Sequence, residues 1–341
     1  MADNFFAKYL NSKNIIFAFV MFLFLFFIIN CKDIAIMFFA SFVIACSLNP
    51  VVDKLEEKIP RTLAAVIVIF LITFLFAIIF IHVFISSTEQ IKTFLYKLPH
   101  YIDNVDEYVF SLPVVKNFSF LSGDVDNIME QISLSSGDVI QKIVDIGKNI
   151  SSAFIYLIVS VIIVFNVIVD KNKIKDFYLH LFPREMRPKA QEVGKIISNK
   201  MGGYLIALVL TTLSVGVVMA IGLTILKVPY AMLLALITAV FDIVPVIGPL
   251  IAVIVCIIAT YEAGIGAIIS VIVVFAISQL IENNFVRPYV FSKFLHLHPL
   301  VIFLFLFLAA QYMGLIGVIF APALAAITAV LFEELYLKKI D

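Results

Sequence analysis

Tryptophan is absent from this chain, and charged side chains are scarce. Asp, Glu, Lys and Arg make up 14% of the 341 residues, and 24 basic residues balance 24 acidic ones. A net charge of zero leaves no electrostatic case for nucleic-acid binding, so we expect no nucleic-acid partner. So little charge also argues against a soluble protein of this length.

Cysteine is nearly absent as well. Cys31, Cys46 and Cys256 are isolated inside or beside apolar runs. Their spacing indicates neither a disulfide framework nor a metal site, and we expect no metal and no cofactor. The chain also has no phosphate-binding loop, no nucleophile elbow and no zinc-protease helix. The sequence therefore gives no support to an enzyme.

Long apolar runs are what the chain has instead. Hydrophobic residues make up 63% of it, and the mean hydropathy is +1.11. This composition predicts an all-α, polytopic membrane protein with about eight helical segments in the bilayer. The first run lacks a small-residue cleavage site, so we interpret it as an uncleaved helix. Continuous apolar runs cover 15–29, 34–48, 63–85, 150–169, 204–226 and 265–281.

One long hydrophilic insert divides the chain into three parts. Residues 1–86 carry membrane helices 1 to 3, 87–149 form an amphipathic helical insert, and 150–341 form a membrane core. The insert is acidic, whereas Lys and Arg gather before helix 1, between helices 2 and 3, and between helices 4 and 5. By the positive-inside rule, the insert lies outside and both termini are cytoplasmic.

The membrane core contains an interrupted apolar stretch, 229–261. About a dozen apolar residues end at Asp242, and a second arm follows Pro249. Spanning the hydrocarbon takes about 20 apolar residues, so neither arm crosses alone. Proline and glycine leave backbone groups unpaired, which is tolerated in a membrane only where protein or water shields them. We therefore expect a re-entrant hairpin here.

A second interrupted stretch, 299–332, breaks at Gly314 and Gly317. Each stretch follows a glycine-led helix, a polar link and a proline, and the expected orientations are opposite. This pattern predicts an inverted repeat whose two bent tips meet at a transport site. The alternative is two unrelated hairpins in a membrane protein that tolerates glycine and proline.

Asp242 is the first candidate for function. A carboxylate at membrane depth is costly, which makes it a functional hypothesis by default. It also ends a helix, where the dipole is already negative, so it suits a cation or a proton. The alternative is that Asp242 caps the next helix or lies near the interface.

Further candidates surround the two breaks. Pro245, Gly248 and Pro249 shape the first one, with an architectural role favoured over ligand contact. Gln279 and Glu282 lie three residues apart, on one helix face. With Arg287 nearby, this polar cluster could line a substrate path or close a gate by an ion pair, or simply be an interfacial helix end. The remaining candidate binding residues are Asn283, Gln311, Gly314 and Gly317.

Several motifs together resemble the autoinducer-2 exporter family of bacterial membrane proteins. They are Leu48-Asn49-Pro50-Val51-Val52 with Pro60-Arg61, Val228-Pro229-Tyr230-Ala231, Ile243 to Pro249, Glu282 to Pro288, Leu297-His298-Pro299 and Gly314 to Gly317. The resemblance implies an inner-membrane transporter of about eight helices that forms a homo-oligomer. It also implies export of the quorum-sensing signal autoinducer-2 or, in other members, sodium/proton antiport. Val246 replaces an aromatic residue common in the family, so a ligand contact by that ring is not expected.

Two transport functions and one different class of function remain open. The first is export of a small polar solute such as autoinducer-2 across the lipid bilayer by alternating access. The second is cation/proton antiport through Asp242. The third is a membrane scaffold that binds a partner through its outer insert.

Overall fold

The computed structural model describes residues 30–78, 81, 90, 93, 96, 150–244, 247–291 and 298–335. Within these ranges the regular elements are helices, with no strand. This confirms the all-α membrane fold. The first apolar run, 15–29, and most of the expected insert, 87–149, lie outside the described residues.

Five helices in the described part of the chain are long and apolar enough to cross a membrane, and a bent pair makes up to six. In the bent pair, α7 (Ile150–Val169) turns by 76° into α8 (Lys171–His180). The others are α3 (Lys32–Glu56), the helix Arg61–Ile78, α9 (Arg187–Ile225) with the short η1 (Arg184–Met186) before it, α12 (Ile265–Ile281) with its continuation, and α14 (Pro299–Leu335).

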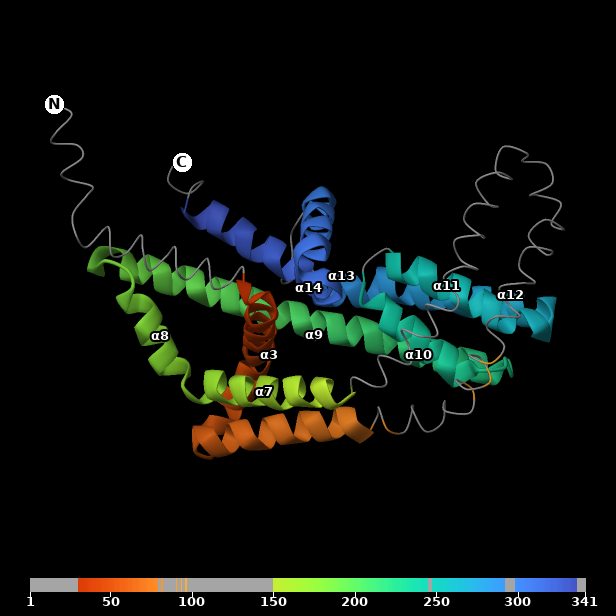
Figure 1. Cartoon of the computed structure of the whole chain (residues 1–341), viewed down its shortest axis with the longest axis horizontal. Coiled ribbons are helices and arrows are strands. Elements are labelled where there is room, and N and C mark those ends of the chain that lie inside the picture. Colours follow the sequence, from red (N-terminus) through yellow and green to blue (C-terminus); the bar gives the residue numbers. More distant parts are fainter. Residues whose placement is uncertain are drawn as a thin grey trace, which may run out of the picture.

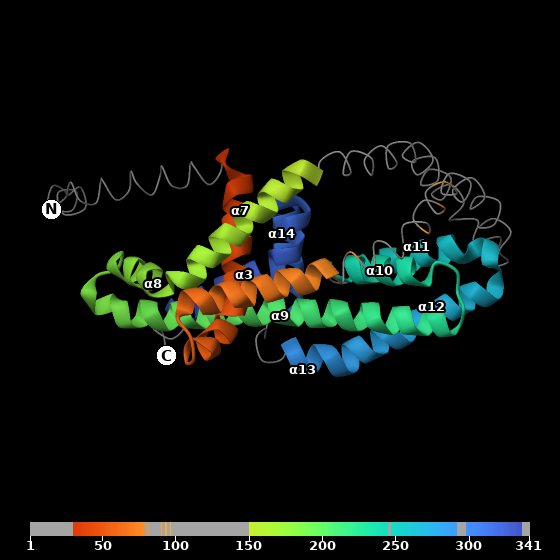
Figure 2. The same ribbon diagram turned by 90° about the horizontal axis from the view of Figure 1, so that it is seen from below.

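The longest helix, α9, runs through the middle of the molecule (Figures 1 and 2). Two shorter apolar helices, α10 (Ala231–Asp242) and α11 (Ile247–Thr260), lie along one end of α9 and are followed by the short η2 (Tyr261–Ala263) and α12. The buried core there is built from α9, α10, α11 and α12. A second core joins α9 to α3 and to the later part of α14. Helix α3 crosses α9, whereas the darker blue end of α14 runs obliquely over α9 toward the C-terminus (Figure 1).

The crossing of α3 and α9 depends on a proline and a glycine. The apolar run 34–48 stops just before Pro50, but α3 continues through Pro50 to Glu56. Proline has no N–H, so the carbonyl of Cys46 loses its partner four residues on. That carbonyl oxygen lies only 2.4 Å from where a Cβ at Gly202 would be. The absence of a side chain at Gly202 is therefore what lets α3 come this close to α9.

A polar network joins the ends of three helices. Arg61 donates to the carbonyl of Ile168 near the end of α7 (2.7 Å), to Asp53 (2.9 Å) and to Asn49 (2.9 Å). Lys171 at the start of α8 bonds the other oxygen of Asp53 (2.7 Å). The last carbonyls of a helix have no partner within it, so Arg61 satisfies one of them and complements the helix dipole.

Both expected breaks are present. Helix α10 ends at Asp242 and α11 begins at Ile247. Helix α14 is non-helical at Gly314, with φ 62° and ψ −148°. In each case the second arm packs back against the first, since α10 contacts α11 and the start of α14 contacts its later part around Val318. Both stretches are therefore hairpins, whereas the inverted repeat stays a prediction.

The expected meeting of the two tips is not seen among the described residues, which leave out Pro245 and Val246. Val244, in the turn of the first hairpin, packs against the arms of the second one, beside Leu306 and Val318. At the tip of the second hairpin, a Cβ added at Gly314 would have no described atom within 4 Å, and Leu315 is 69% exposed. The reason is orientation: the first hairpin lies along α9, while the start of α14 stands across α9 (Figure 1).

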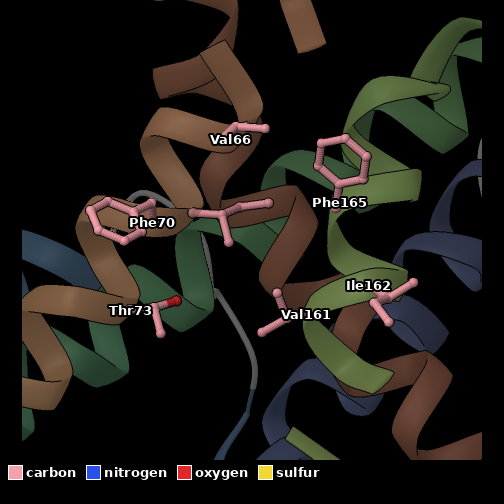
Figure 3. Close-up of a pocket in the computed structure, with 7 residues that line it drawn as sticks. Val66, Phe70, Thr73, Val161, Ile162 and Phe165 are labelled. Atoms are coloured by element: carbon pink, nitrogen blue, oxygen red, sulfur yellow. The ribbon is translucent and has the colours of Figure 1, made fainter. Parts of the chain in front are cut away.

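An apolar groove of about 360 Å³ separates α7 from the helix Arg61–Ile78 (Figure 3). Thr73 supplies its one polar side chain, and no charged residue lines it. A groove without polar contacts suits hydrocarbon and not a polar solute. Its lining is Val66, Ile69, Phe70, Thr73, Val161, Ile162 and Phe165.

Candidate functional site

Asp242 is the last residue of α10 and is 3% exposed. Within the described residues, neither oxygen of its carboxylate has a hydrogen-bond partner. An unpaired charge in a protein interior is expensive, and the carbonyls that end α10 add negative potential. A proton or a cation at Asp242 would remove both penalties. The alternative that Asp242 caps the next helix finds no hydrogen bond to support it.

Gly248 holds the turn that follows Asp242. A Cβ at this position would lie 1.8 Å from the carbonyl oxygen of Phe241, and the Gly248 N–H donates to Val244 (3.0 Å). No side chain fits there, which is the architectural role that the sequence favoured. Pro249 is the third residue of α11, in the first turn, where a missing N–H costs little. Pro245 lies outside the described residues.

Glu282 is fully buried and is paired with Arg287. The Arg287 Nε donates to one oxygen of Glu282 at 2.6 Å, and the Gln279 amide donates to the other at 3.3 Å. The shared helix face expected for Gln279 and Glu282 is therefore present. Arg287 is about one third exposed, so the pair sits at the edge of the buried interior.

A π-helical turn makes the pairing of Glu282 with Arg287 possible. The turn η3 (Glu282–Val286) follows α12 directly and leads into α13 (Arg287–Phe291), and the Arg287 N–H bonds the Glu282 carbonyl. Residues five apart on an α-helix point about 140° away from each other. The wider π turn brings them back onto one face, and such turns are frequent at functional sites.

The two elements converge on one charged group. Asp242, from α10, interacts electrostatically with Glu282 and Arg287 and lies beside Gln279. Only Glu282 is ion-paired with Arg287, and Asp242 lies within electrostatic range of both. The group therefore has one negative charge in excess when both carboxylates are ionised. We call Asp242, Gln279, Glu282 and Arg287 the charged cluster. Among the described residues, no group of His, Cys, Asp or Glu side chains is arranged to hold a metal ion.

The other predicted residues do not join this cluster. Asn283 is exposed in the π turn. Gln311 and Gly314 lie at the exposed tip of the second hairpin. Gly317 is buried, and its missing side chain lets the second arm approach the carbonyl of Ala309. Gln311 and Asp242, each a short way before a break, therefore have different surroundings: Asp242 is buried and Gln311 is exposed.

Arg287 is the residue whose importance sequence reasoning underestimates. The sequence places it in the polar cluster as one half of a possible ion pair, but not among the binding residues. Its spacing of five from Glu282 does not fit one face of an α-helix, which hides the pair. The feature that could have indicated the π turn is the polar run Glu282-Asn283-Asn284 at the end of an apolar helix, where an extra residue can widen a turn.

Comparison with known proteins agrees with this architecture. The family model "AI-2E family transporter" matches residues 15–337. The candidate transport protein YueF of Bacillus subtilis (strain 168) is 26% identical over 292 residues, covering 83% of this chain and 79% of YueF. The candidate transport protein MJ1177 of Methanocaldococcus jannaschii is 26% identical, covering 80% and 81%. The candidate permease PerM of Escherichia coli (strain K12) is 25% identical, covering 67% of each chain.

The family match extends from the first apolar run to the end of α14 and includes both hairpins and the charged cluster. The chain is therefore a member of the AI-2E family of transporters.

Proposed function

We propose that this membrane transporter exports a small polar solute, such as autoinducer-2, by alternating access, and that the charged cluster couples the movement to an ion. Family membership supports transport in general. The observation that carries the proposal is the buried, unpaired carboxylate of Asp242 at a helix break. Ionisable residues inside membrane segments are characteristic of ion and proton pathways.

The mechanism follows from competition for Arg287. While Asp242 carries a proton or a bound cation, Arg287 stays with Glu282 in the observed pair. Once Asp242 is ionised, Arg287 is attracted to both carboxylates, and the first hairpin is drawn toward α13. A π turn can change register by one residue, which makes it a suitable joint for this movement. Each turnover then links the charge state of Asp242 to the position of the hairpin.

A second function, cation/proton antiport without an organic solute, is favoured by the excess negative charge of the cluster. Two carboxylates and one guanidinium leave one site for a single positive charge, and H⁺ and Na⁺ would compete for it. We also propose that the protein works as a homo-oligomer in the inner membrane with both termini in the cytoplasm, as the family resemblance and the distribution of Lys and Arg favour.

The test uses the purified chain in proteoliposomes, with imposed pH or sodium gradients. We expect efflux of loaded autoinducer-2 that depends on the protein and accelerates under one gradient. Asp242→Asn should abolish this acceleration while the protein stays as stable or becomes more so, because a costly buried charge is removed. Glu57→Gln, at an exposed carboxylate with no partner in the described residues, is the matched control and should transport normally.

The outcomes separate the candidates. Exchange of Na⁺ for H⁺ without solute flux would favour the antiporter. Gradient-driven flux that is unchanged in Asp242→Asn would contradict the coupling role in both. If no solute or cation moves through the wild-type protein, a membrane scaffold that binds a partner through residues 87–149 becomes the better explanation.

A further inference from the structure

Helix α8 follows a membrane-length helix at a steep angle. The 20 residues of α7 contain no charged side chain, and α8 turns away from the described part of α7 by 76°. A helix that leaves a membrane-crossing helix at such an angle runs along the bilayer surface and not through it. With three lysines in ten residues, α8 is also far too polar to enter the hydrocarbon.

The side chains of α8 are sorted around its axis. Ile174, Phe177 and Leu181 share one side at spacings of three and four, and they are 42%, 70% and 62% exposed. Asn172, Asp176 and His180, spaced by four, share the opposite side and are exposed. Three large apolar side chains in a row that no described residue covers mark a surface that contacts something apolar.

The lysines stand between these two sides. By helical geometry, Lys173 and Lys175 lie on either flank of the apolar row, about 100° from Ile174. Lys173 is paired with Asp170 (2.8 Å), and Lys175 makes no ion pair with any described residue. Flanking lysines can bury their methylene stems while their charges reach the headgroup level. Arg184, just beyond α8, adds another exposed positive charge.

Contacts with α9 fix the rotation of α8. The Tyr178 ring lies against Gly194, 3.5 Å from a Cβ position there, and packs edge-on against Phe182. The Tyr178 hydroxyl reaches the carbonyl of Ala190 at 3.4 Å. Lys171 at the start of α8 is tied to Asp53 of α3. Since the helix cannot turn freely, the row Ile174–Phe177–Leu181 is held away from the protein.

We propose that α8 is an interfacial helix that docks on anionic phospholipid, with Ile174, Phe177 and Leu181 at the acyl boundary and Lys173 and Lys175 at the headgroup phosphates. An apolar face of this kind is typical of helices that lie in the membrane interface. Charge complementarity selects anionic lipid, because lysines near the surface are attracted to an anionic leaflet. The proposal does not depend on what is transported.

The absence of tryptophan permits a clean test in the full-length protein. In Phe177→Trp, reconstituted in vesicles, the indole is the sole one. We expect blue-shifted emission that is strongly quenched by phospholipids brominated near the headgroup end of the acyl chain. Asn172→Trp, on the opposite side of α8, should emit as a solvated indole and be quenched by iodide. Phe70→Trp, 66% exposed on the helix Arg61–Ile78, should respond best to deeply placed bromines.

Lipid selectivity is read from mixed vesicles. Brominated phosphatidylglycerol in unbrominated phosphatidylcholine should quench Phe177→Trp more than the inverse mixture does. Because Lys173 is paired with Asp170, we count one lysine, Lys175, which should enrich phosphatidylglycerol around α8 roughly fivefold. Adding Lys173→Gln and Lys175→Gln should abolish this difference and leave the blue shift. High salt should weaken the selectivity in the same way.

Three results would overturn the proposal. One is a Phe177→Trp spectrum like that of Asn172→Trp. Another is blue-shifted emission without quenching by brominated lipid, which would mean that protein covers the face. The third is equal quenching in the two mixtures, which would show that α8 has no preference for anionic lipid. If Phe177→Trp fails to fold, Leu181→Trp reports on the same face and is decided by the same readings.

Discussion

The two broken hairpins have similar sequences and different surroundings. Both are apolar, and a glycine stands at or near each turn. Yet Val244 of the first turn packs against α14 and the buried Asp242 lies beside it, whereas the second turn is exposed and a Cβ added at its glycine would meet no described atom within 4 Å. A glycine in a membrane hairpin thus has two separate uses: at Gly248 it makes space, and at Gly314 it permits a backbone conformation.

The largest effect should come from Gly248→Ala compared with Gly314→Ala. The new methyl at 248 would lie 1.8 Å from the Phe241 carbonyl oxygen, so the turn must open. We expect a loss of more than about 5 kcal/mol, among the largest that single substitutions produce. At Gly314 there is open space, and the strained backbone alone should cost about 1–3 kcal/mol. Thermal unfolding in detergent, followed by size-exclusion chromatography, measures both. Equal losses would refute this distinction.

A middle-sized effect is expected at the ion pair beside the first hairpin, for which the second has no counterpart among the described residues. Arg287→Met leaves the fully buried Glu282 without its cation, which should cost about 3 kcal/mol. Adding Glu282→Gln removes the stranded charge, so the double variant should be more stable than Arg287→Met alone. Unfolding midpoints of the two variants and the wild type check this. A double variant that is less stable than Arg287→Met would contradict the role of the pair.

The sequence predicted what depends on local chemistry. Apolar runs gave the membrane helices, and the Pro/Gly clusters gave both breaks, because a missing N–H or a missing Cβ acts on the backbone where it occurs. It also predicted that Asp242 would be costly, since a lone carboxylate among apolar residues needs no knowledge of the fold.

What failed depends on distant contacts. Val244 of the first turn packs against the arms of the second hairpin and not against its exposed tip. Close approaches such as that of Gly202 to Cys46 set how α3 crosses α9, and no local pattern records such an angle. Helix α3 continues through Pro50, which local rules would end. The sequence suggested an ion pair in this polar cluster but did not place Arg287 among the binding residues, because a π turn changes the spacing at which side chains share a face.

The smallest effect concerns the segment that leads into each hairpin. Before the first one, α9 ends in a Schellman motif: the Val228 N–H bonds the Leu223 carbonyl (2.9 Å), and the Lys227 N–H bonds that of Thr224 (3.1 Å). Lys227 takes the left-handed conformation, with φ 53°, at the position where glycine is usual. Lys227→Gly should therefore stabilise the protein by about 1 kcal/mol, whereas Lys227→Ala should not.

The segment before the second hairpin should respond in the opposite sense. His298 precedes α14, and its Nδ1 accepts the N–H of Leu300 at 3.3 Å, so the side chain caps the helix. Pro299 follows at the first helical position, where its lack of an N–H costs nothing. His298→Gly loses the side-chain cap and should cost a few tenths of a kcal/mol. In detergent, the unfolding midpoint should rise in Lys227→Gly and fall in His298→Gly. A shift of the same sign in both variants would contradict the different roles given to Lys227 and His298.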